Sequence, residues 1–330
     1  MPVSFKKPSL HNRNKHQDGY HFDLLIQTLP SLAQFVKPNG YGNLSIDFAD
    51  PKAVKMLNKA LLLHYYQLSW WDIPDGYLCP PVPGRADYIH SLADLLAQDN
   101  GNQIPCGKQV KVLDIGVGAN VIYPILGRAE YGWSFVGSDI NPIAIKTASL
   151  ICQANNLLNG YVLCRLQKDK TAIFKHIIKP KEFYLLTLCN PPFHSSEQEA
   201  LVSTRKKLTN LGKLTSPTQK AVLNFGGQHA ELWCQGGESV FITKMIKESV
   251  VFKHQCLWFT SLVSKKSSLE LIQKQLKVAG VIDSKIIPMA QGQKVSRFVA
   301  WTFFNKNERK DLFKKISGNT SVSIKNNSAY

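Results

Sequence analysis

Four short apolar runs alternate with segments of helical spacing through the middle of the chain. The runs 111–115, 133–138, 161–166 and 183–189 have the length and apolar content of buried strands. Between the second and third runs, Asn141-Pro142 places an N-cap residue before a proline at the first helical position. Strands that alternate with helices in this order predict an α/β protein with a largely parallel sheet.

The second half of the chain continues this pattern and then departs from it. We predict helices over 241–249 and 267–279, on either side of a strand over 257–263. Residues 285–304 have the pattern of two strands joined by Gln291-Gly292-Gln293. This pattern predicts that the sheet closes with a hairpin.

The first 77 residues carry a different, mostly helical pattern. Apolar residues at 22, 25, 26 and 29 share one face of a predicted helix. Asp50-Pro51 starts a second helix, which we expect to end near Gln67. The aromatic residues that follow are expected to anchor the core rather than to stack on bases; they are Trp70, Trp71 and Tyr77.

The net charge distinguishes this chain from an ordinary α/β protein. It contains 40 Lys and Arg residues against 23 Asp and Glu, which gives a formal charge of +17 over 330 residues. Such an excess predicts a polyanionic partner, and nucleic acid above all. The basic N-terminal residues therefore suggest an arm that contacts RNA; they are Lys6, Lys7, His11, Arg13, Lys15 and His16.

The cysteines and the N-terminus indicate a reducing, non-membrane setting. The seven cysteines include no Cys-x-x-Cys pair, which argues against a disulfide framework and a zinc site. We expect Cys152, Cys164 and Cys189 to be small buried hydrophobes. The first residues lack the apolar core of a signal peptide, and no run reaches the roughly 20 apolar residues of a membrane span. We therefore expect a cytoplasmic protein.

The motif Asn190-Pro191-Pro192-Phe193 follows the strand 183–189 directly. Two prolines interrupt both a strand ladder and the interior of a helix, because they lack an N–H and their φ is fixed. The turn must therefore lie at the carboxyl edge of the sheet, where open α/β sheets hold ligands. Its amide, carbonyls and aromatic ring can accept hydrogen bonds from a planar amine and stack on the ring that carries it.

A second motif supplies the other half of a two-substrate site. The strand 111–115 runs into Gly116 and Gly118, which allow a tight turn and close approach of a ligand. Asp139 ends the next strand, 21 positions after Gly118, which is the spacing of an acidic residue that binds ribose hydroxyls. The order of glycine turn, acidic strand end and Asn-Pro-Pro-Phe is far more specific than any of its parts.

This order resembles the class I methyltransferases that use S-adenosylmethionine to methylate exocyclic amines. Further segments are similar to the bacterial 23S ribosomal RNA adenine-N6 methyltransferase F family, and more distantly to the human U6 small nuclear RNA adenine methyltransferase. The similarity extends from about Asn12 to Phe304 and is carried by the segments 44–50, 71–74, 78–90 and 224–228. It implies a Rossmann-like fold with a seven-stranded, mostly parallel sheet, one antiparallel strand and a helical N-terminal extension.

The resemblance also implies a role for each acceptor residue. The Asn190 side-chain oxygen and the Pro191 carbonyl would accept the two N–H bonds of an adenine amine. Phe193 would stack on an adenine swung out of its helix or loop. Pro192 would keep the turn rigid. The expected acceptor is 23S ribosomal RNA or an assembly intermediate of the large subunit, with no obligate protein partner evident.

On the donor side, the resemblance implies that S-adenosylmethionine binds along the glycine turn. Arg85 would bind its carboxylate as a fork. Asp114 would fix the turn or approach the amino group, Asp139 would hold the ribose hydroxyls, and Ile140 would pack on the donor's adenine. Asn120 stands where a third glycine is common, which puts the detailed shape of the turn in doubt. Asp169 is a weaker candidate for contact with the donor's adenine. The histidines show no metal spacing, and the reaction needs no metal.

These patterns divide the chain into three parts. Residues 1–77 form the basic extension, 78–304 the methyltransferase domain, and 305–330 a polar, basic tail that we expect to fray. The domain carries an insertion over 195–233, whose Arg205-Lys206-Lys207 is as consistent with RNA contact as with a solvated surface helix.

Other functions remain open at this stage. A protein-glutamine N5 methyltransferase uses a related turn, although its usual fourth residue is Tyr rather than Phe193. A DNA adenine methyltransferase often carries a base-reading domain, and nothing in the sequence identifies one. A non-catalytic RNA-binding or ribosome-assembly module is a further alternative, against which the intact motifs argue.

Overall fold

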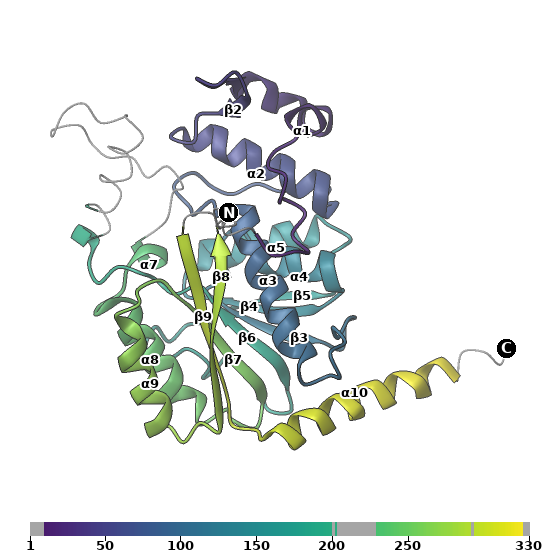
Figure 1. Ribbon diagram of the computed structural model, residues 1–330, viewed down its shortest axis with the longest axis vertical. Helices are drawn as coiled ribbons and strands as arrows, with labels where there is room; N and C mark the ends of the chain where they lie inside the picture. Colours follow the sequence, from purple (N-terminus) through teal and green to yellow (C-terminus); the bar gives the residue numbers. More distant parts are fainter. Residues whose placement is uncertain (1–9, 200–201, 203–228, 292–293, 326–330) are drawn as a thin grey trace, which may run out of the picture.

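One seven-stranded sheet organises the computed structural model, which describes residues 10–199, 202, 229–291 and 294–325 (Figure 1). The strand order is β5-β4-β3-β6-β7-β9-β8. β9 is antiparallel to both of its neighbours, β7 and β8, and the other described strands of this sheet all run in the opposite direction to β9. The expected mostly parallel sheet with one antiparallel strand is thus confirmed. The strands are β3 (Lys111–Ile115), β4 (Ser134–Asp139), β5 (Val162–Leu166), β6 (Tyr184–Cys189), β7 (Cys256–Val263), β8 (Asp283–Gln291) and β9 (Lys294–Thr302).

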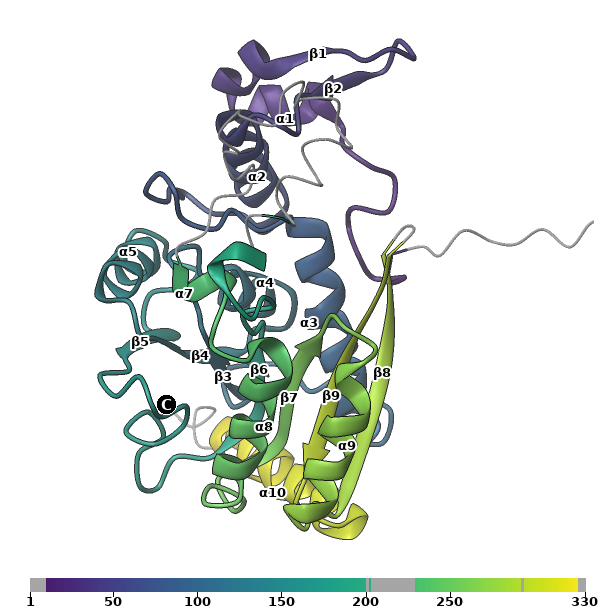
Figure 2. The same cartoon turned by 90° about the vertical axis from the view of Figure 1, so that its left-hand side faces the viewer.

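Helices cover both faces of the sheet because its strands alternate their apolar side chains between two cores. In β3, Val112 packs into the core beneath α3 (Val82–Ala97), α4 (Ile122–Tyr131) and α5 (Pro142–Gln153). Leu113 points to the opposite core, beneath α8 (Gly237–Ser249) and α9 (Ser268–Val278). Figure 2 shows these two helical layers on either side of the strands.

The N-terminal residues form a lobe beyond the carboxyl ends of the parallel strands (Figures 1 and 2). In α2 (Pro51–Tyr66) the Asp50 side chain accepts a hydrogen bond from the Lys52 amide, as the capping pattern predicts, and the helix ends at the predicted position, where Gln67 is left-handed. Tyr66, rather than Tyr65, is the buried tyrosine at its end. The lobe contains α1 (Phe22–Thr28), η1 (Pro30–Phe35), β1 (Val36–Pro38), β2 (Leu44–Ile46) and α2 (Pro51–Tyr66).

The segment before α1 is bound to α3 and α4. His11 Nε2 lies 2.8 Å from Asp94 Oδ2, and Arg13 donates to Asp94 Oδ1 at 2.7 Å. Lys15 pairs with Glu130 at 2.9 Å. Much of the positive charge that suggested an RNA-contacting arm therefore has partners within the chain, while the two lysines nearer the terminus lie outside the described residues.

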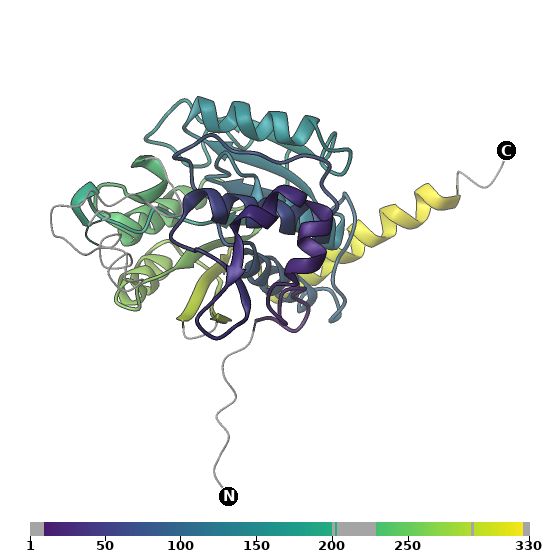
Figure 3. The same cartoon turned by 90° about the horizontal axis from the view of Figure 1, so that it is seen from above.

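The expectation of a frayed tail is wrong over Lys306–Lys325, which form α10. Asn305 Oδ1 accepts from the amides of Asn307 and Glu308, and Glu308 accepts from the Asn305 amide, so the helix begins with a capping box. Phe313 is buried against the domain. Beyond this anchored part, α10 extends away from the body of the molecule (Figure 3).

The remaining sequence expectations have mixed outcomes. Trp71 and Tyr77 are buried core residues, whereas Trp70 is 40% exposed. Cys152 and Cys189 are buried, and Cys164 is half-buried. Most of the insertion over 195–233, including Arg205-Lys206-Lys207, lies outside the described residues, as do the segment 224–228 and the tip of the β8–β9 hairpin. In the described part of the chain, no helix has the length and apolarity that a membrane crossing requires.

Candidate active site

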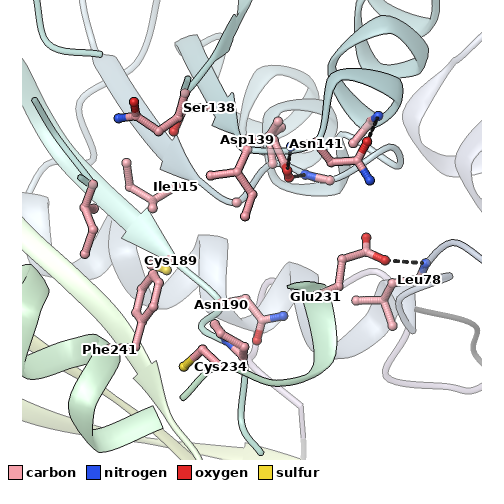
Figure 4. Close-up of a pocket in the computed structure, with 18 of the residues that line it drawn as sticks. Leu78, Ile115, Ser138, Asp139, Asn141, Cys189, Asn190, Glu231, Cys234 and Phe241 are labelled. Atoms are coloured by element: carbon pink, nitrogen blue, oxygen red, sulfur yellow. Dashed lines mark hydrogen bonds between the residues drawn. The ribbon is translucent and has the colours of Figure 1, made fainter. Parts of the chain in front are cut away.

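A cavity of about 450 Å³ opens at the carboxyl ends of β3, β4 and β6 (Figure 4). Its size falls within the range of about 300–1,000 Å³ that is usual for small-molecule sites. Asp139 and Asn190 approach it from opposite sides in the close-up. The predicted donor and acceptor motifs therefore line one space.

The glycine turn forms one wall of this cavity. Gly116 and Gly118 both line it and have φ angles of 77° and 64°, in the left-handed region that side chains disfavour. A Cβ on Gly118 would lie 3.1 Å from Asn120 Nδ2. The turn thus favours glycine for its conformation at both positions, and a Cβ at Gly118 would also press on the Asn120 side chain.

Asp139 holds the turn from the neighbouring strand. Its Oδ2 accepts from the Gly118 amide at 3.0 Å, and its Oδ1 accepts from the Asn141 amide at 2.8 Å. Burial raises the pKa of Asp139, and these backbone donors oppose the shift. Ile140 also lines the cavity. The carboxylate and the turn therefore hold each other in place at the cavity wall.

Asn120, which departs from the common third glycine, connects the turn to the segment before α3. Its Nδ2 donates to the Leu78 carbonyl at 3.1 Å, and its Oδ1 accepts from the Ile122 amide at 3.0 Å. Trp71 Nε1 donates to the Asn120 carbonyl at 3.0 Å. The side chain that replaces glycine is thus a structural tie between the cavity and the N-terminal residues.

Arg85 lines the cavity from the first turn of α3. Its Nη1 donates to the Tyr123 hydroxyl at 2.9 Å, and its guanidinium lies 5.7 Å from the centre of that ring. Burial raises the pKa of Tyr123 to about 12, and the charge of Arg85 acts in the opposite direction. Tyr123 therefore stays a neutral partner that orients Arg85 without neutralising its charge.

Asp114 does not line the cavity, but its carboxylate interacts electrostatically with Asp139 and Arg85, which do. Neither of its oxygens has a hydrogen-bond partner among the described residues, so it does not fix the turn through such a bond. Burial raises its pKa well above the usual value, the charge of Asp139 raises it further, and that of Arg85 lowers it. An unpartnered buried carboxyl of this kind costs free energy unless it is neutral or meets a cation.

The acceptor turn closes the other side of the cavity. Asn190 and Pro192 line it, whereas Pro191 and Phe193 are not among the lining residues. The Asn190 Oδ1 atom is buried and has no hydrogen-bond partner in the described part of the chain. Such atoms are rare in folded proteins, so this oxygen is a candidate acceptor for a ligand N–H.

Several lining residues come from the last residues of the insertion and those directly after it, and sequence reasoning did not identify them as site residues. Glu231, on the short helix α7 (His229–Leu232), accepts from the Leu78 amide at 3.3 Å. Figure 4 draws Glu231 together with Asn190 among the side chains that line the cavity. A parallel bridge between His194 and Trp233 joins the residue before the insertion to its last residue and so brings this segment to the cavity. The return of the chain after an insertion leaves no local sequence signal.

The loop after β5 also differs from the expectation. Gln167, Lys170 and Thr171 line the cavity, whereas Asp169 does not. The Asp169 carboxylate instead accepts from the Thr171 amide and hydroxyl at 2.8 and 2.6 Å. No group of three or more His, Cys, Asp or Glu side chains that could hold a metal ion is found among the described residues.

Comparison with known proteins adds independent findings. A family model described as RNA methyltransferase matches residues 4–305. The chain is 55% identical over 304 residues to "Ribosomal RNA large subunit methyltransferase F" of Serratia proteamaculans (strain 568), covering 92% of this chain and 90% of the relative. It is 52% identical over 316 residues to the protein of the same name from Pseudoalteromonas translucida (strain TAC 125), covering 96% and 100%.

The chain is also similar to solved methyltransferase structures. The hMettl16 catalytic domain in complex with MAT2A 3'UTR hairpin 1 is 30% identical, with a TM-score of 0.74, over 90% of this chain and 96% of that one. The N-terminal domain of human METTL16 in complex with SAH is 27% identical, with a TM-score of 0.70, over 90% and 100%. These similarities confirm the family resemblance that the sequence predicted.

Proposed function

The chain belongs to this RNA methyltransferase family, and we propose that it methylates the exocyclic N6 amine of one adenine in 23S ribosomal RNA. S-adenosylmethionine is the proposed methyl donor. The observation that carries the proposal is the buried, unpartnered Oδ1 of Asn190, which lies in the same cavity as the glycine turn and Asp139. One space thus contains an acceptor for an amine N–H and the wall of a nucleotide site.

The donor half of the proposal rests on the residues of the turn and its neighbours. S-adenosylmethionine supplies a methyl group on a sulfonium. Gly116 and Gly118 allow its methionine part to approach the backbone, and Arg85 is oriented to bind its carboxylate. Asp139 and Ile140 would hold its ribose and its adenine. Support comes from the related human domain that was solved in complex with SAH, the form of this donor without its transferable methyl group.

Asp114 fits this arrangement as a charge partner rather than as a direct wall of the cavity. It interacts electrostatically with both Arg85 and Asp139. We propose that the positive amino group of the donor offsets the cost of its buried carboxyl. A ligand charge in this position would lower the pKa of Asp114 and favour its ionised form.

The acceptor half must bind the adenine amine and leave its lone pair free. Asn190 Oδ1 and the Pro191 carbonyl would accept its two N–H bonds, which favours a pyramidal nitrogen. Phe193 would stack on the adenine, and Pro192 would keep the turn rigid. Alignment of the two substrates and exclusion of water then supply the rate enhancement, because this displacement requires no strong acid or base.

The surroundings of the cavity support a large polyanionic substrate. Lys170 and Lys244 line the cavity, and the whole chain carries a charge of +17. We propose that residues 1–77 form an RNA-contacting extension to the methyltransferase domain 78–304 and that the substrate is 23S RNA or an assembly intermediate. Such a substrate also places the reaction in the cytoplasm. The tail 305–330 would be peripheral to this site.

The test is a product analysis with labelled donor. The protein is incubated with isotope-labelled S-adenosylmethionine and ribosomal RNA from cells that lack the enzyme, and the RNA is digested to nucleosides. We expect labelled N6-methyladenosine with the wild type and with Asn100→Ala, a matched change in the loop between α3 and β3. With Asn190→Ala we expect this product to fall by about 100-fold or more while donor binding persists.

The other outcomes separate the alternatives. Label in a protein fraction but not in RNA would favour the glutamine methyltransferase. Donor that fails to bind in calorimetry would leave the non-catalytic RNA-binding module. Full activity of Asn190→Ala would contradict the acceptor assignment even if N6-methyladenosine forms.

A further inference from the structure

A buried chain of hydroxyl groups lies at the end of β6, one residue before Asn190. The Tyr88 hydroxyl on α3 is 2.7 Å from Thr260 Oγ1 on β7, and the Thr260 hydroxyl donates to the Thr187 carbonyl on β6 at 2.8 Å. Burial raises the pKa of Tyr88 well above its usual value, and the backbone amide of Cys189 acts in the opposite direction. Tyr88, Thr187 and Thr260 are all fully buried.

The donor and acceptor roles in this chain are fixed by elimination. The Thr260 hydrogen is used for the Thr187 carbonyl, so Tyr88 must donate to Thr260. The Tyr88 oxygen is then available to accept from the Cys189 amide. The bonds therefore run in one direction from Tyr88 on α3 through Thr260 on β7 to Thr187 on β6.

These hydrogen-bonded hydroxyl groups lie where the regular pairing of β6 with β7 ends. The registered pairs of β6 with β7 are Tyr184 with Cys256 and Leu186 with Trp258. Both strands continue beyond this point, to Cys189 and Val263. Over these last residues the hydroxyl chain joins β6 to β7 in place of further registered pairs, and a Thr260 amide bond to Thr187 Oγ1 at 3.3 Å supports it.

The same helix also reaches the donor side. Arg85 and Tyr88 are three residues apart on α3, which places them on one face of the helix. The Tyr88 ring packs edge-on against the ring of Tyr123, whose hydroxyl binds Arg85, with 5.6 Å between ring centres. The position of α3 therefore affects both the acceptor turn and the residue proposed to bind the donor.

We propose that Tyr88, acting through Thr260, is a positioning residue that fixes the end of β6 and thereby aims Asn190 at the acceptor amine. Tyr88 does not line the cavity, so its effect must pass through the backbone of β6. The kinetic part of this inference rests on the proposed function. Without the hydroxyl, Thr260 loses its donor and the polar contact of Tyr88 with the end of β6 is lost, so the strand end is free to shift.

The experiment compares two Tyr→Phe variants on the full chain. Tyr88→Phe removes the hydroxyl beneath the acceptor turn. Tyr184→Phe is the matched control, because Tyr184 is equally buried, lies at the opposite end of β6 and binds Glu182 through its hydroxyl at 2.8 Å. Each is measured for kcat and KM with ribosomal RNA, for donor affinity, for the unfolding midpoint in urea and for hydrogen exchange of the Cys189 amide.

We expect Tyr88→Phe to lower kcat about 10-fold or more, with donor affinity unchanged, because small misplacements of reacting groups cost up to about 100-fold in rate. Exchange at Cys189 should accelerate about 10-fold. Tyr184→Phe should change neither kcat nor the exchange rate at Cys189, even if it shifts the unfolding midpoint as far as Tyr88→Phe does. Thr260→Ser, which keeps the hydroxyl, should retain activity that Thr260→Val loses.

Two results would overturn the inference. One is equal kcat and equal exchange at Cys189 in Tyr88→Phe and the wild type, and the other is equal activity of Thr260→Ser and Thr260→Val. If exchange accelerates only in Tyr88→Phe but the wild type methylates no RNA, the proposed function fails while the support of the turn by Tyr88 stands.

Discussion

The amide of Gly118 donates to Oδ2 of Asp139 at 3.0 Å, so the glycine turn and the end of β4 form one unit. The second oxygen of Asp139 accepts from Asn141. The carboxylate therefore has two tasks in the proposed site: it orients the turn, and it presents negative charge to the ribose hydroxyls of the donor.

Asp139→Asn tests both tasks. An amide has a single oxygen to accept with, so one of the two backbone N–H groups would face an NH₂ group instead. We expect affinity for S-adenosylmethionine to fall about 10- to 100-fold, since hydrogen bonds to charged groups contribute about 1.5–3 kcal/mol. Titration calorimetry measures this change. Asp311→Asn, on the exposed face of α10, should bind as the wild type does, and equal affinity of both variants would refute the assignment of Asp139.

The sequence predicted the sheet well because each strand carries its own pattern. The run 183–189 is apolar except for Thr187, as suits a strand buried on both faces, and the structure has β6 at Tyr184–Cys189. The helix that begins at Asp50-Pro51 was equally predictable, because its cap is local. The capping box of α10 was also present in the sequence, but the polar composition after it favoured a frayed tail.

The candidate site was predictable only where its residues belong to motifs. Gly116, Asp139 and Asn190 lie at strand ends, and the parallel sheet brings strand ends together. Glu231 reaches the cavity through the His194–Trp233 bridge, a contact that no local pattern indicates. Tyr88 and its hydroxyl chain were equally hidden, because a buried tyrosine on an apolar helix face looks like ordinary core.

Asn120→Ala tests whether the tie between the turn and the N-terminal residues supports donor binding. The variant loses the bonds to the Leu78 carbonyl and the Ile122 amide. We expect the free energy of unfolding to fall by about 1–3 kcal/mol and donor affinity to fall with it. Urea unfolding and calorimetry provide the two measurements.

The matched control for this prediction is Asn155→Ala. Asn155 accepts from the Ser69 and Trp70 amides, so it ties the same connecting segment to α5, and it does not line the cavity. Its loss should destabilise the protein by a similar amount and leave donor affinity unchanged. If both variants weaken donor binding equally, general loosening of the segment explains the effect.

Arg309→Leu tests how α10 is attached. Arg309 and Asp99 form an ion pair at 3.0 Å with side chains only 5% and 3% exposed. Removing the cation leaves Asp99 buried with Trp258 Nε1 as its remaining donor among the described residues, which should cost about 3–5 kcal/mol of unfolding free energy.

The control is Lys314→Leu, which removes an exposed pair on the same helix and should change the free energy of unfolding by less than about 1 kcal/mol. Similar urea midpoints for the two variants would show that the pair does not anchor α10.

His16 provides a prediction about pH. Its Nε2 contacts the Tyr66 hydroxyl at 2.9 Å, and its Nδ1 is buried without a partner among the described residues. Burial and, to a smaller extent, the nearby charge of Lys15 together lower the pKa of His16 to about 4. In the unfolded chain the pKa is about 6.5. The folded state therefore excludes a proton that the unfolded state binds between these two values.

The sign of the effect follows from this difference. The contribution of His16 to stability is complete above about pH 6.5 and is lost as the pH falls toward about 4, with a slope of up to about 1.4 kcal/mol per pH unit. Urea unfolding between pH 7.5 and 4.5 should give a smaller slope for His16→Gln than for the wild type. Part of the slope should remain in His16→Gln, because His90, whose pKa burial lowers to about 3, contributes to it as well. The exposed His21→Gln should retain the full slope, and parallel curves for wild type and His16→Gln would mean that the folded protein does not hold His16 neutral.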